Sequence, residues 1–322
     1  MPQASPAYAV GRVRVLENTL LGHSQLERLA LTQSVEELAR ALVENNWGEV
    51  RTRGDIEKMC DAHMREAAKL VRDCSSDPDL TDCFLIQYDA LNLKALYKAR
   101  ALGEARVALS GLGLLDPEGL RRMVEENNYQ DLPAELREAM QDIDRRSAVK
   151  MDPLYVDARL DKAVFSFIEN RMATCKEETI RLYFICRAEL INLMIALRSG
   201  AMGRGAAFAR ELFVTGGTLS CDGLSKVAEE PDRAYDLIRY RPYAYALSAP
   251  VKALDRNAIE RAGEDYLLGL FRPHRYEPTS ILPLVGYLLA RTRESQAVRL
   301  LATAKATGVS QEKLSSCLRA LY

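Results

Sequence analysis

The sequence predicts an all-α protein made of three related helical subdomains. Apolar residues recur at the i, i+3, i+4, i+7 spacing of an amphipathic helix, and no region shows several alternating strands joined by hairpin turns. One fifteen-residue pattern also occurs three times, over residues 89–103, 189–203 and 294–308. The stretches begin 100 and then 105 residues apart, and such regular repetition is typical of related structural units.

The three repeated stretches, called the signature helices below, each open with an acidic residue and close with a glycine. They read DALNLKALYKARALG, ELINLMIALRSGAMG and ESQAVRLLATAKATG. Glycine suits the left-handed residue that ends a helix. The third copy departs from the pattern, because Ala297 stands where the first two have asparagine. The residues that define the pattern are Asp89, Asn92, Gly103, Glu189, Asn192, Gly203, Glu294 and Gly308.

The acid and the asparagine of a signature helix lie three residues apart, so Asp89 and Asn92 share one helix face. We expect a structural role, in which these side chains form hydrogen bonds with a neighbouring helix or loop. Contact with a partner protein is the alternative. Catalysis is disfavoured because no histidine or second acid accompanies them.

A second element also recurs, in the stretches LTQSVEELARALVENNWGEV, LDPEGLRRMVEENNYQDLP and LSCDGLSKVAEE. In each stretch a short polar residue precedes a helical run, namely Ser34, Asp116 or Ser220. These residue types cap helix N-termini. A long helix over residues 152–172 is predicted in the same way, with an aspartate as its N-cap and a proline at its first position.

The intervals between repeats divide the chain into three predicted subdomains, residues 1–112, 113–214 and 215–322. Each contains one signature helix. A unit of about 100 residues is long for a solenoid repeat. We therefore expect three similar units around a common axis, which would form a ring, funnel or cup.

Composition excludes several classes of protein. The chain has 322 residues, 48% of them hydrophobic, and a net charge of −1, which gives no general attraction to nucleic acid or anionic lipid. The longest apolar run, SILPLVGYLLA, has about half of the roughly twenty residues that a membrane-spanning helix needs. The N-terminal stretch lacks the apolar core of a signal peptide. Seven scattered cysteines without a CxxC pair indicate reduced thiols in a cytosolic protein.

The sequence predicts no metal site, cofactor site or catalytic residue. His23, His63 and His274 are far apart and lack a ligand spacing such as HExxH. The glycines of SGAMGRGAAF follow a helix, whereas a dinucleotide-binding loop follows a strand. We interpret them as a helix end and a loop.

Two basic stretches, RYRPYAYALSAPVKALDR and FRPHRYEP, combine arginines with tyrosines or histidine. Such mixtures can bind single-stranded nucleic acid, but the near-zero net charge disfavours it. We expect surface loops that connect subdomains. Contact with a partner protein is the alternative, and its candidate residues are Arg239, Arg241, Arg272 and Arg275.

Four motifs resemble one known family of the V-type and A-type rotary ATPases, which comprises the prokaryotic C subunits and the eukaryotic d subunits. YAVGRVRVLENTLL resembles the opening helix of that family, DALNLKALYKAR its most characteristic motif, and ELFVTGGTLS its glycine turn. The stretch from residue 282 to 322 is similar to that family's C-terminal segment. The resemblance covers essentially the whole chain, with the motifs in the family's order.

This resemblance implies a funnel-shaped helical protein with three-fold pseudosymmetry, located on the cytoplasmic face of the membrane. Such a protein sits on the proteolipid ring, receives the foot of the D and F subunits of the central stalk, and transmits torque for proton or sodium transport. It has no catalytic centre and binds no nucleotide. The alternatives are a helical-repeat adaptor of another complex and a helical enzyme whose site has no sequence motif.

Overall fold

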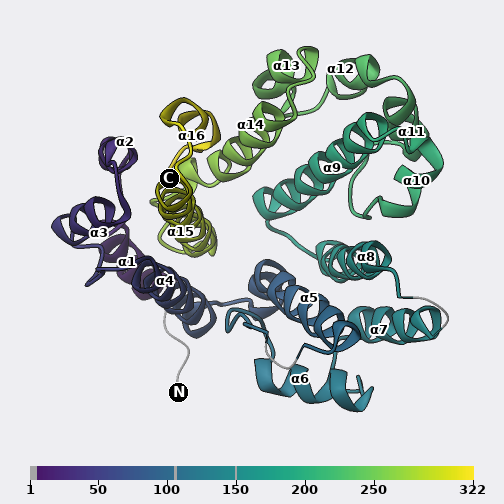
Figure 1. Cartoon of the computed structure of the whole chain (residues 1–322), viewed down its shortest axis with the longest axis horizontal. Coiled ribbons are helices and arrows are strands. Elements are labelled where there is room, and N and C mark those ends of the chain that lie inside the picture. Colours follow the sequence, from purple (N-terminus) through teal and green to yellow (C-terminus); the bar gives the residue numbers. More distant parts are fainter. Residues whose placement is uncertain (1–5, 105–106, 149–150) are drawn as a thin grey trace. The chain divides into compact units, whose positions relative to one another are not determined.

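The computed structural model describes residues 6–104, 107–148 and 151–322, and every regular element within these ranges is a helix (Figure 1). The predicted all-α class is therefore confirmed for the described residues. The α-helices are α1 (Pro6–Glu17), α2 (His23–Leu31), α3 (Val35–Glu44), α4 (Arg53–Cys74), α5 (Pro78–Leu102), α6 (Pro117–Glu126), α7 (Ala134–Ser147), α8 (Pro153–Met172), α9 (Glu178–Ala201), α10 (Gly205–Leu212), α11 (Cys221–Glu229), α12 (Ala234–Ile238), α13 (Ala244–Lys252), α14 (Arg256–Gly269), α15 (Leu282–Thr307) and α16 (Gln311–Cys317). Two short 3-10 helices are η1 (Pro231–Arg233) and η2 (Arg272–His274).

The predicted N-caps are confirmed. The side chains of Ser34, Asp116 and Ser220 each accept a hydrogen bond from the backbone N–H three residues later, at the starts of α3, α6 and α11. Asp152 caps α8 in the same way, and Pro153 occupies the first helical position, where its missing N–H costs nothing.

The signature helices are the C-terminal parts of α5, α9 and α15, and all three end alike. Gly103, Gly203 and Gly308 have positive φ angles of 71°, 66° and 69°. In each case the next residue donates its backbone N–H to the carbonyl five residues earlier, at 2.9, 2.9 and 3.0 Å. This is the Schellman arrangement, in which a left-handed residue lets the chain satisfy the last carbonyls of a helix. The predicted glycine ends are confirmed.

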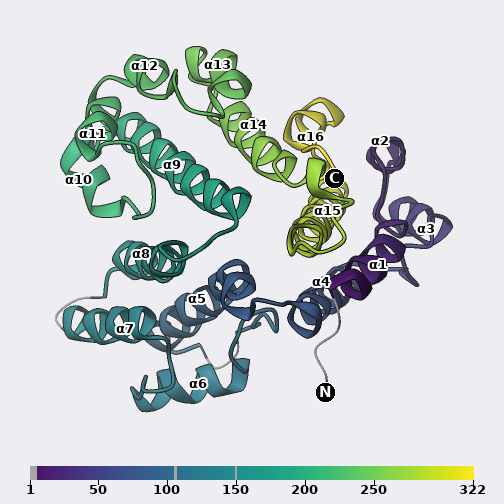
Figure 2. The ribbon, with the colours of Figure 1, turned by 180° about the vertical axis from the view of Figure 1, so that it is seen from behind.

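One compact unit of the chain combines the residues up to 78 with residues 257–322. In this unit α15 packs against α4 and α1, and its apolar core also takes in α2, α3 and α16. Figures 1 and 2 show α4 and α15 side by side. Trp47 and Leu301, far apart in sequence, are both buried in this core. The third signature helix therefore lies in one unit with residues from both ends of the described chain.

The second compact unit comprises residues 79–256. In it α7 lies along α8, while α10 and α11 pack on α9 (Figure 1). The first two signature helices belong to α5 and α9, which meet at equivalent positions. The rings of Phe84 and Phe184 have centroids 4.7 Å apart, and Arg187 donates a hydrogen bond of 2.5 Å to Gln87. Both pairs span 100 residues, the interval that separates the repeats.

The predicted division into three subdomains stays a prediction, as do the funnel and its pseudosymmetry. The structure separates into the two compact units described above, one of which contains two signature helices.

The expectation of a loop over residues 239–256 is wrong for part of that stretch. Residues Ala244–Lys252 form α13, because Ala244, Leu247 and Val251 bury one helical face. Pro250 lies near the end of α13, where its missing N–H breaks only one hydrogen bond of the helix.

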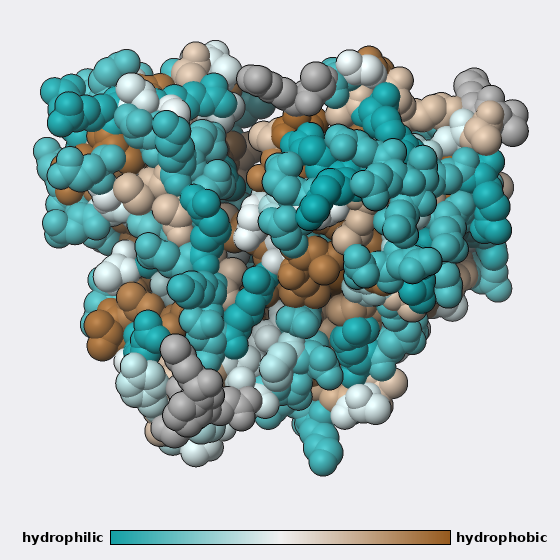
Figure 3. Space-filling model, turned by 90° about the horizontal axis from the view of Figure 1, so that it is seen from below, coloured by the Kyte–Doolittle hydropathy of each residue, from teal (hydrophilic) through white to brown (hydrophobic). Residues whose placement is uncertain are grey.

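Figure 3 shows one face, on which hydrophilic residues predominate and hydrophobic residues gather in small separate groups. Among the described residues, no helix has the length and apolar character that crossing a bilayer requires.

Candidate functional site

The first signature helix holds the loop that precedes α6. Asn92 and Ser110 exchange two hydrogen bonds of 2.8 Å: the amide nitrogen of Asn92 donates to the Ser110 carbonyl, and the Ser110 backbone N–H donates to the Asn92 side-chain oxygen. The carboxylate of Asp89 accepts the backbone N–H groups of Leu114 at 2.7 Å and Leu115 at 3.2 Å. Asp89 and Asn92 are both buried. They therefore replace, for this loop, the hydrogen bonds that water would otherwise provide.

The second signature helix holds the loop before α11 through equivalent bonds. Asn192 and Val214 exchange side-chain and backbone hydrogen bonds of 2.9 and 2.8 Å. Glu189 accepts both the backbone N–H and the hydroxyl of Thr218, at 3.0 and 2.9 Å. In both loops the residue bound by the asparagine lies four positions before one bound by the acid. The two repeats thus share a detailed contact, which we call an anchor.

Each of these anchors has a glycine where the loop comes close to the helix. A Cβ atom on Gly113 would lie 1.9 Å from Oδ1 of Asp89, a distance that real Cβ atoms essentially never show. One on Gly217 would lie 3.0 Å from Cγ of Glu189, which is tighter than nine in ten real Cβ contacts and would make the neighbouring atom move by a few tenths of an ångström. Gly113 is therefore needed for the close approach of its loop to the helix, and Gly217 favours the same approach in the second anchor.

The second anchor has an additional ionic part. Glu189 is fully buried, and Arg241 donates hydrogen bonds to its carboxylate, one of them 2.9 Å long. The buried hydroxyl of Tyr243 donates to the same carboxylate at 2.8 Å. Burial and the charge of Glu189 raise the pKa of Tyr243, so this hydroxyl stays protonated as a donor. Arg241 and Tyr243 thereby tie the segment between α12 and α13 to α9.

The third signature helix keeps the acid but not the asparagine. Glu294 accepts the backbone N–H of Leu21 at 2.6 Å, just before α2 begins, and pairs with Arg291, which is 4% exposed. Arg291 also donates to the hydroxyl of Thr19 at 2.7 Å. Ala297, at the asparagine position, belongs to the apolar core. The expected structural role of the signature acids and asparagines thus has a specific form, the binding of loops.

The four predicted partner-contact arginines differ in how far they are engaged within the chain. Arg241 binds Glu189, and Arg272 donates to the carbonyl of Leu321 at 2.6 Å. Arg275 lies 3.5 Å from the carboxylate of Glu17 and over a tyrosine ring. Arg239 has a side chain 49% exposed and pairs at 3.6 Å with Asp236 in its own helical turn. Contact of these arginines with a partner stays a prediction, and Arg239 is the one best placed for it.

Among the residues that the structure describes, the histidines and cysteines form no cluster suited to a metal ion. In the described parts of the chain, no three His, Cys, Asp or Glu residues are grouped so that they could hold one. Among the described residues no disulfide bond joins any of the seven cysteines, and Cys221 is exposed. His63 packs edge-on against Trp47, with ring centroids 4.7 Å apart. Burial, together with the charge of Arg291, lowers the pKa of His63 to about 4, so it is neutral at pH 7.

Sequence reasoning missed the loop side of each anchor. Ser110, Val214 and Leu21 contribute backbone groups, so their side chains carry no signal. The glycines Gly113 and Gly217 did carry one, because they lie at equivalent positions between a signature helix and a capped short helix.

Fold and anchors together define a class: an all-helical protein with internal repeats, whose buried acids and amides fasten interhelical loops. Residues 9–317 match the family described as the ATP synthase (C/AC39) subunit, and the chain belongs to this family.

Curated relatives agree with this assignment. The C subunit of the A-type ATP synthase of Halorubrum lacusprofundi is 25% identical, over 97% of either chain. That of Haloferax volcanii is 23% identical, again over 97% of either chain. The C subunit of the V-type sodium ATPase of Enterococcus hirae is 22% identical, over 96% of this chain and 97% of its own. The family resemblance seen in the four motifs is confirmed.

Proposed function

We propose that this chain is a non-catalytic component of the central stalk of a V-type or A-type rotary ATPase. It acts as a socket that joins the shaft, made of the D and F subunits, to the proteolipid ring on the cytoplasmic face of the membrane. It passes torque between them and thereby couples ATP chemistry to the transport of protons or sodium ions. The observation that carries the proposal is the family match over residues 9–317.

The names of the relatives support the assignment to a rotary complex. They describe the C subunits of A-type ATP synthases and of a V-type sodium ATPase, and these chains align with this one over nearly their whole lengths.

The anchors support the mechanical part of the proposal. A torque-transmitting wall must resist twisting, and packed helices resist it because protein interiors are nearly incompressible. Loops between helices are ordinarily the weakest part of such a wall. Here Asp89, Glu189 and Glu294 each bind a loop from a buried helical position, which stiffens these connections.

A polar surface fits a socket protein that is folded both on its own and within the assembled ATPase. A polar surface lets a foreign helix end dock without a large apolar patch that would aggregate in the free protein. The exposed large hydrophobic residues include Tyr240 and Tyr245, which combine an apolar ring with a polar tip. We propose that Arg239, Arg241, Arg272 and Arg275 include contacts to the shaft or the ring.

The three signature helices fit a funnel of three subdomains, over residues 1–112, 113–214 and 215–322. The similar anchors in α5 and α9, and the related one in α15, support common ancestry of the three. The loop that the third signature helix binds, near residue 21, belongs to the first of these three segments.

Co-purification with the D and F subunits of the same organism tests the proposal. The tagged chain is co-expressed with the folded D–F pair, purified by size exclusion and cross-linked. The proposal predicts a stable complex with cross-links to this chain. Failure to bind a D–F pair that is itself folded would contradict it and favour a helical-repeat adaptor of another complex.

A further inference from the structure

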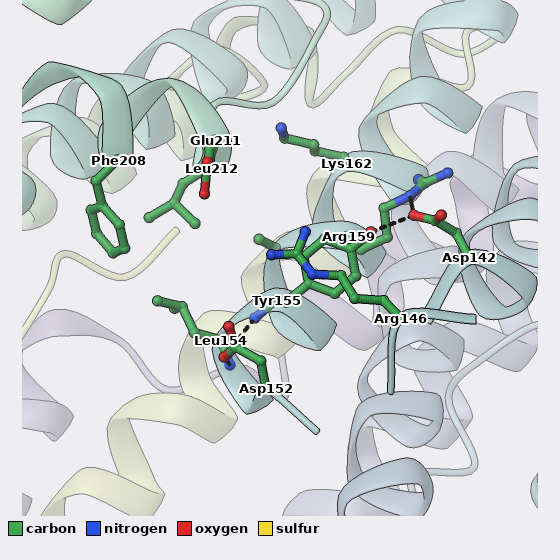
Figure 4. A pocket seen from close by; sticks show the side chains of 11 residues that line it. Asp142, Arg146, Asp152, Leu154, Tyr155, Arg159, Lys162, Phe208, Glu211 and Leu212 are labelled. Carbon is green, nitrogen blue, oxygen red and sulfur yellow. Dashed lines mark hydrogen bonds and ion pairs between the residues drawn. The ribbon is translucent and has the colours of Figure 1, made fainter. Parts of the chain in front are cut away.

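A hollow of about 400 Å³ lies within the second unit, between α7, α8 and α10. Such a volume is typical of sites for small ligands or single side chains. Figure 4 shows Phe208 and Leu212 of α10 on one side of the hollow and Arg146 and Asp142 of α7 on the other. Helix α8 lies between them. None of these residues belongs to an anchor.

The acids that line the hollow are mostly engaged within the protein. Asp142 accepts hydrogen bonds from the hydroxyl of Tyr155 and, at 3.1 Å, from Arg159. The hydrogen bond from Tyr155 is the main reason why the pKa of Asp142 is lowered. Asp152 is the N-cap of α8 and accepts backbone N–H groups of its first turn. Of the acids in the lining, Glu211 has no such bond within the described chain.

Two cations in the lining, Arg146 and Lys162, form no direct ion pair with a carboxylate among the described residues. The guanidinium carbon of Arg146 lies over the Tyr155 ring, 3.9 Å from its centroid, within the range of a cation–π contact. Lys162 projects from α8 and is half-buried. Burial, and then the charge of Arg159, lower the pKa of Lys162, while Glu211 and Cys221 act in the opposite direction. An anion in the hollow would therefore relieve an unfavourable charge.

The remainder of the lining is apolar. Leu154, Phe208 and Leu212 present carbon surfaces to the same space (Figure 4). A multiply charged phosphate would be repelled by Glu211 and Asp152 more strongly than a singly charged group, and it would face these carbons. A singly charged group next to an apolar one fits both parts of the lining, since a guanidinium and an ammonium can both donate to one carboxylate.

We propose that this hollow binds an amphipathic monocarboxylate, with the carboxylate between Arg146 and Lys162 and its apolar neighbour against Leu154, Phe208 and Leu212. The source of this group is either a free organic acid or an acidic side chain next to an apolar residue in a partner segment. The proposal does not rest on the rotary-ATPase assignment, because it uses only residues of the second unit.

Calorimetric titration with octanoate tests the site, with octanol as the uncharged probe of matched length. We expect octanoate to bind the full chain and octanol to bind at least about tenfold more weakly, because the charged hydrogen bonds are lost. The variants Arg146→Met and Lys162→Met should each weaken octanoate binding about tenfold. Lys226→Met removes an exposed lysine from α11 of the same unit and should leave binding unchanged. Circular dichroism checks that each variant is folded, and Lys162→Gln is a second substitution at that position.

A second experiment distinguishes a free organic acid from an acidic side chain of a partner segment. It also measures the titration of Lys162. Acetyl-Leu-Glu-Leu-amide is compared with acetyl-Leu-Gln-Leu-amide, and preferential binding of the glutamate peptide assigns the site to a partner segment. With either ligand, the side-chain carbon-13 resonance of Lys162 should report a raised pKa in the complex. The proposal is overturned if neither carboxylate binds, if Lys162→Met binds as wild type does, or if inorganic phosphate binds more tightly than octanoate.

Discussion

The first two anchors and the third all hold a loop against a signature helix, but they use different residues to do so. In α5 and α9, an acid and an asparagine together hold a loop, and the asparagine pairs with one residue through both of that residue's backbone groups. In α15 the acid remains, but Ala297 replaces the asparagine and packs in an apolar core. The comparison indicates that the acid is the common part of the anchor, whereas the amide is used only where a loop passes next to it.

A buried charge accompanies the loss of the amide. Arg291 is buried beside Glu294 and reaches Thr19, so the loop between α1 and α2 is held through an arginine. In the second anchor, Arg241 reaches the acid from a partly exposed position. The third anchor therefore depends most on an intact ion pair, whereas in the first two anchors an asparagine side chain also binds the loop.

The largest expected effect comes from breaking the buried pair in the third anchor. Glu294→Gln leaves Arg291 without a counter-charge in the interior, and we expect a loss of about 4 kcal/mol in the free energy of unfolding. Chemical denaturation measures it. In the double variant Glu294→Gln with Arg291→Met the loss should be smaller than the sum of the two single losses, because the stranded charge is gone. Strict additivity would contradict the buried-pair account.

The glycines of the loops come next. Gly113→Ala places a methyl group where the carboxylate of Asp89 lies, and we expect a loss of about 3 kcal/mol through displaced hydrogen bonds and strain. The matched control is Gly22→Ala, directly after the Leu21 that the third anchor binds, where the nearest atom is the end of a flexible glutamine side chain at 3.4 Å. Its loss should stay below about 1 kcal/mol. Equal losses at both positions would show that close approach is not what selects glycine.

The asparagines should have intermediate effects. Asn92→Ala and Asn192→Ala each leave a backbone N–H and a carbonyl without partners, and we expect losses of about 2 kcal/mol. The converse substitution Ala297→Asn puts a polar amide into an apolar core and should also destabilise, by about 1–2 kcal/mol. Thermal unfolding of the three variants compares them directly. Stabilisation by Ala297→Asn would mean that the third anchor is merely an incomplete copy of the others.

A final difference appears only as the pH falls, and it involves Arg291. His63 has a folded-state pKa of about 4, below its ordinary value near 6.5, because it is buried and faces Arg291. The unfolded chain therefore binds the proton first. The contribution of His63 to stability is complete above pH 6.5 and is lost as the pH falls toward 4. At pH 5 unfolding should take up about one proton more in wild type than in His63→Gln. An identical pH profile for the two proteins would exclude this titration.

Much of the fold could be predicted because its signals are local. Capping residues such as Ser34, Asp116 and Ser220 act within one turn, and the glycine ends of the signature helices act within a few residues. The helix α13 was missed because tyrosines, a proline and basic residues concealed one buried face. The structural role of the asparagines was predicted, but not their partners, because Ser110 and Val214 contribute only backbone atoms.

The hollow beside Lys162 could not be predicted from the sequence, for a related reason. Its lining comes from three helices between residues 142 and 212, and no spacing in the sequence brings them together. The division of the chain into two compact units also depends on contacts between residues far apart in sequence, since α15 binds a loop near residue 21.

Under the proposed function, the signature helices stiffen the wall of a socket and do not themselves contact the shaft. The most direct test measures, for Asn92→Ala and Asn192→Ala, both the free energy of unfolding and the affinity of the folded protein for the D–F pair. The account predicts lower stability with an affinity close to that of wild type. Unchanged stability together with abolished binding would contradict it, and would place the asparagines in the contact with the shaft.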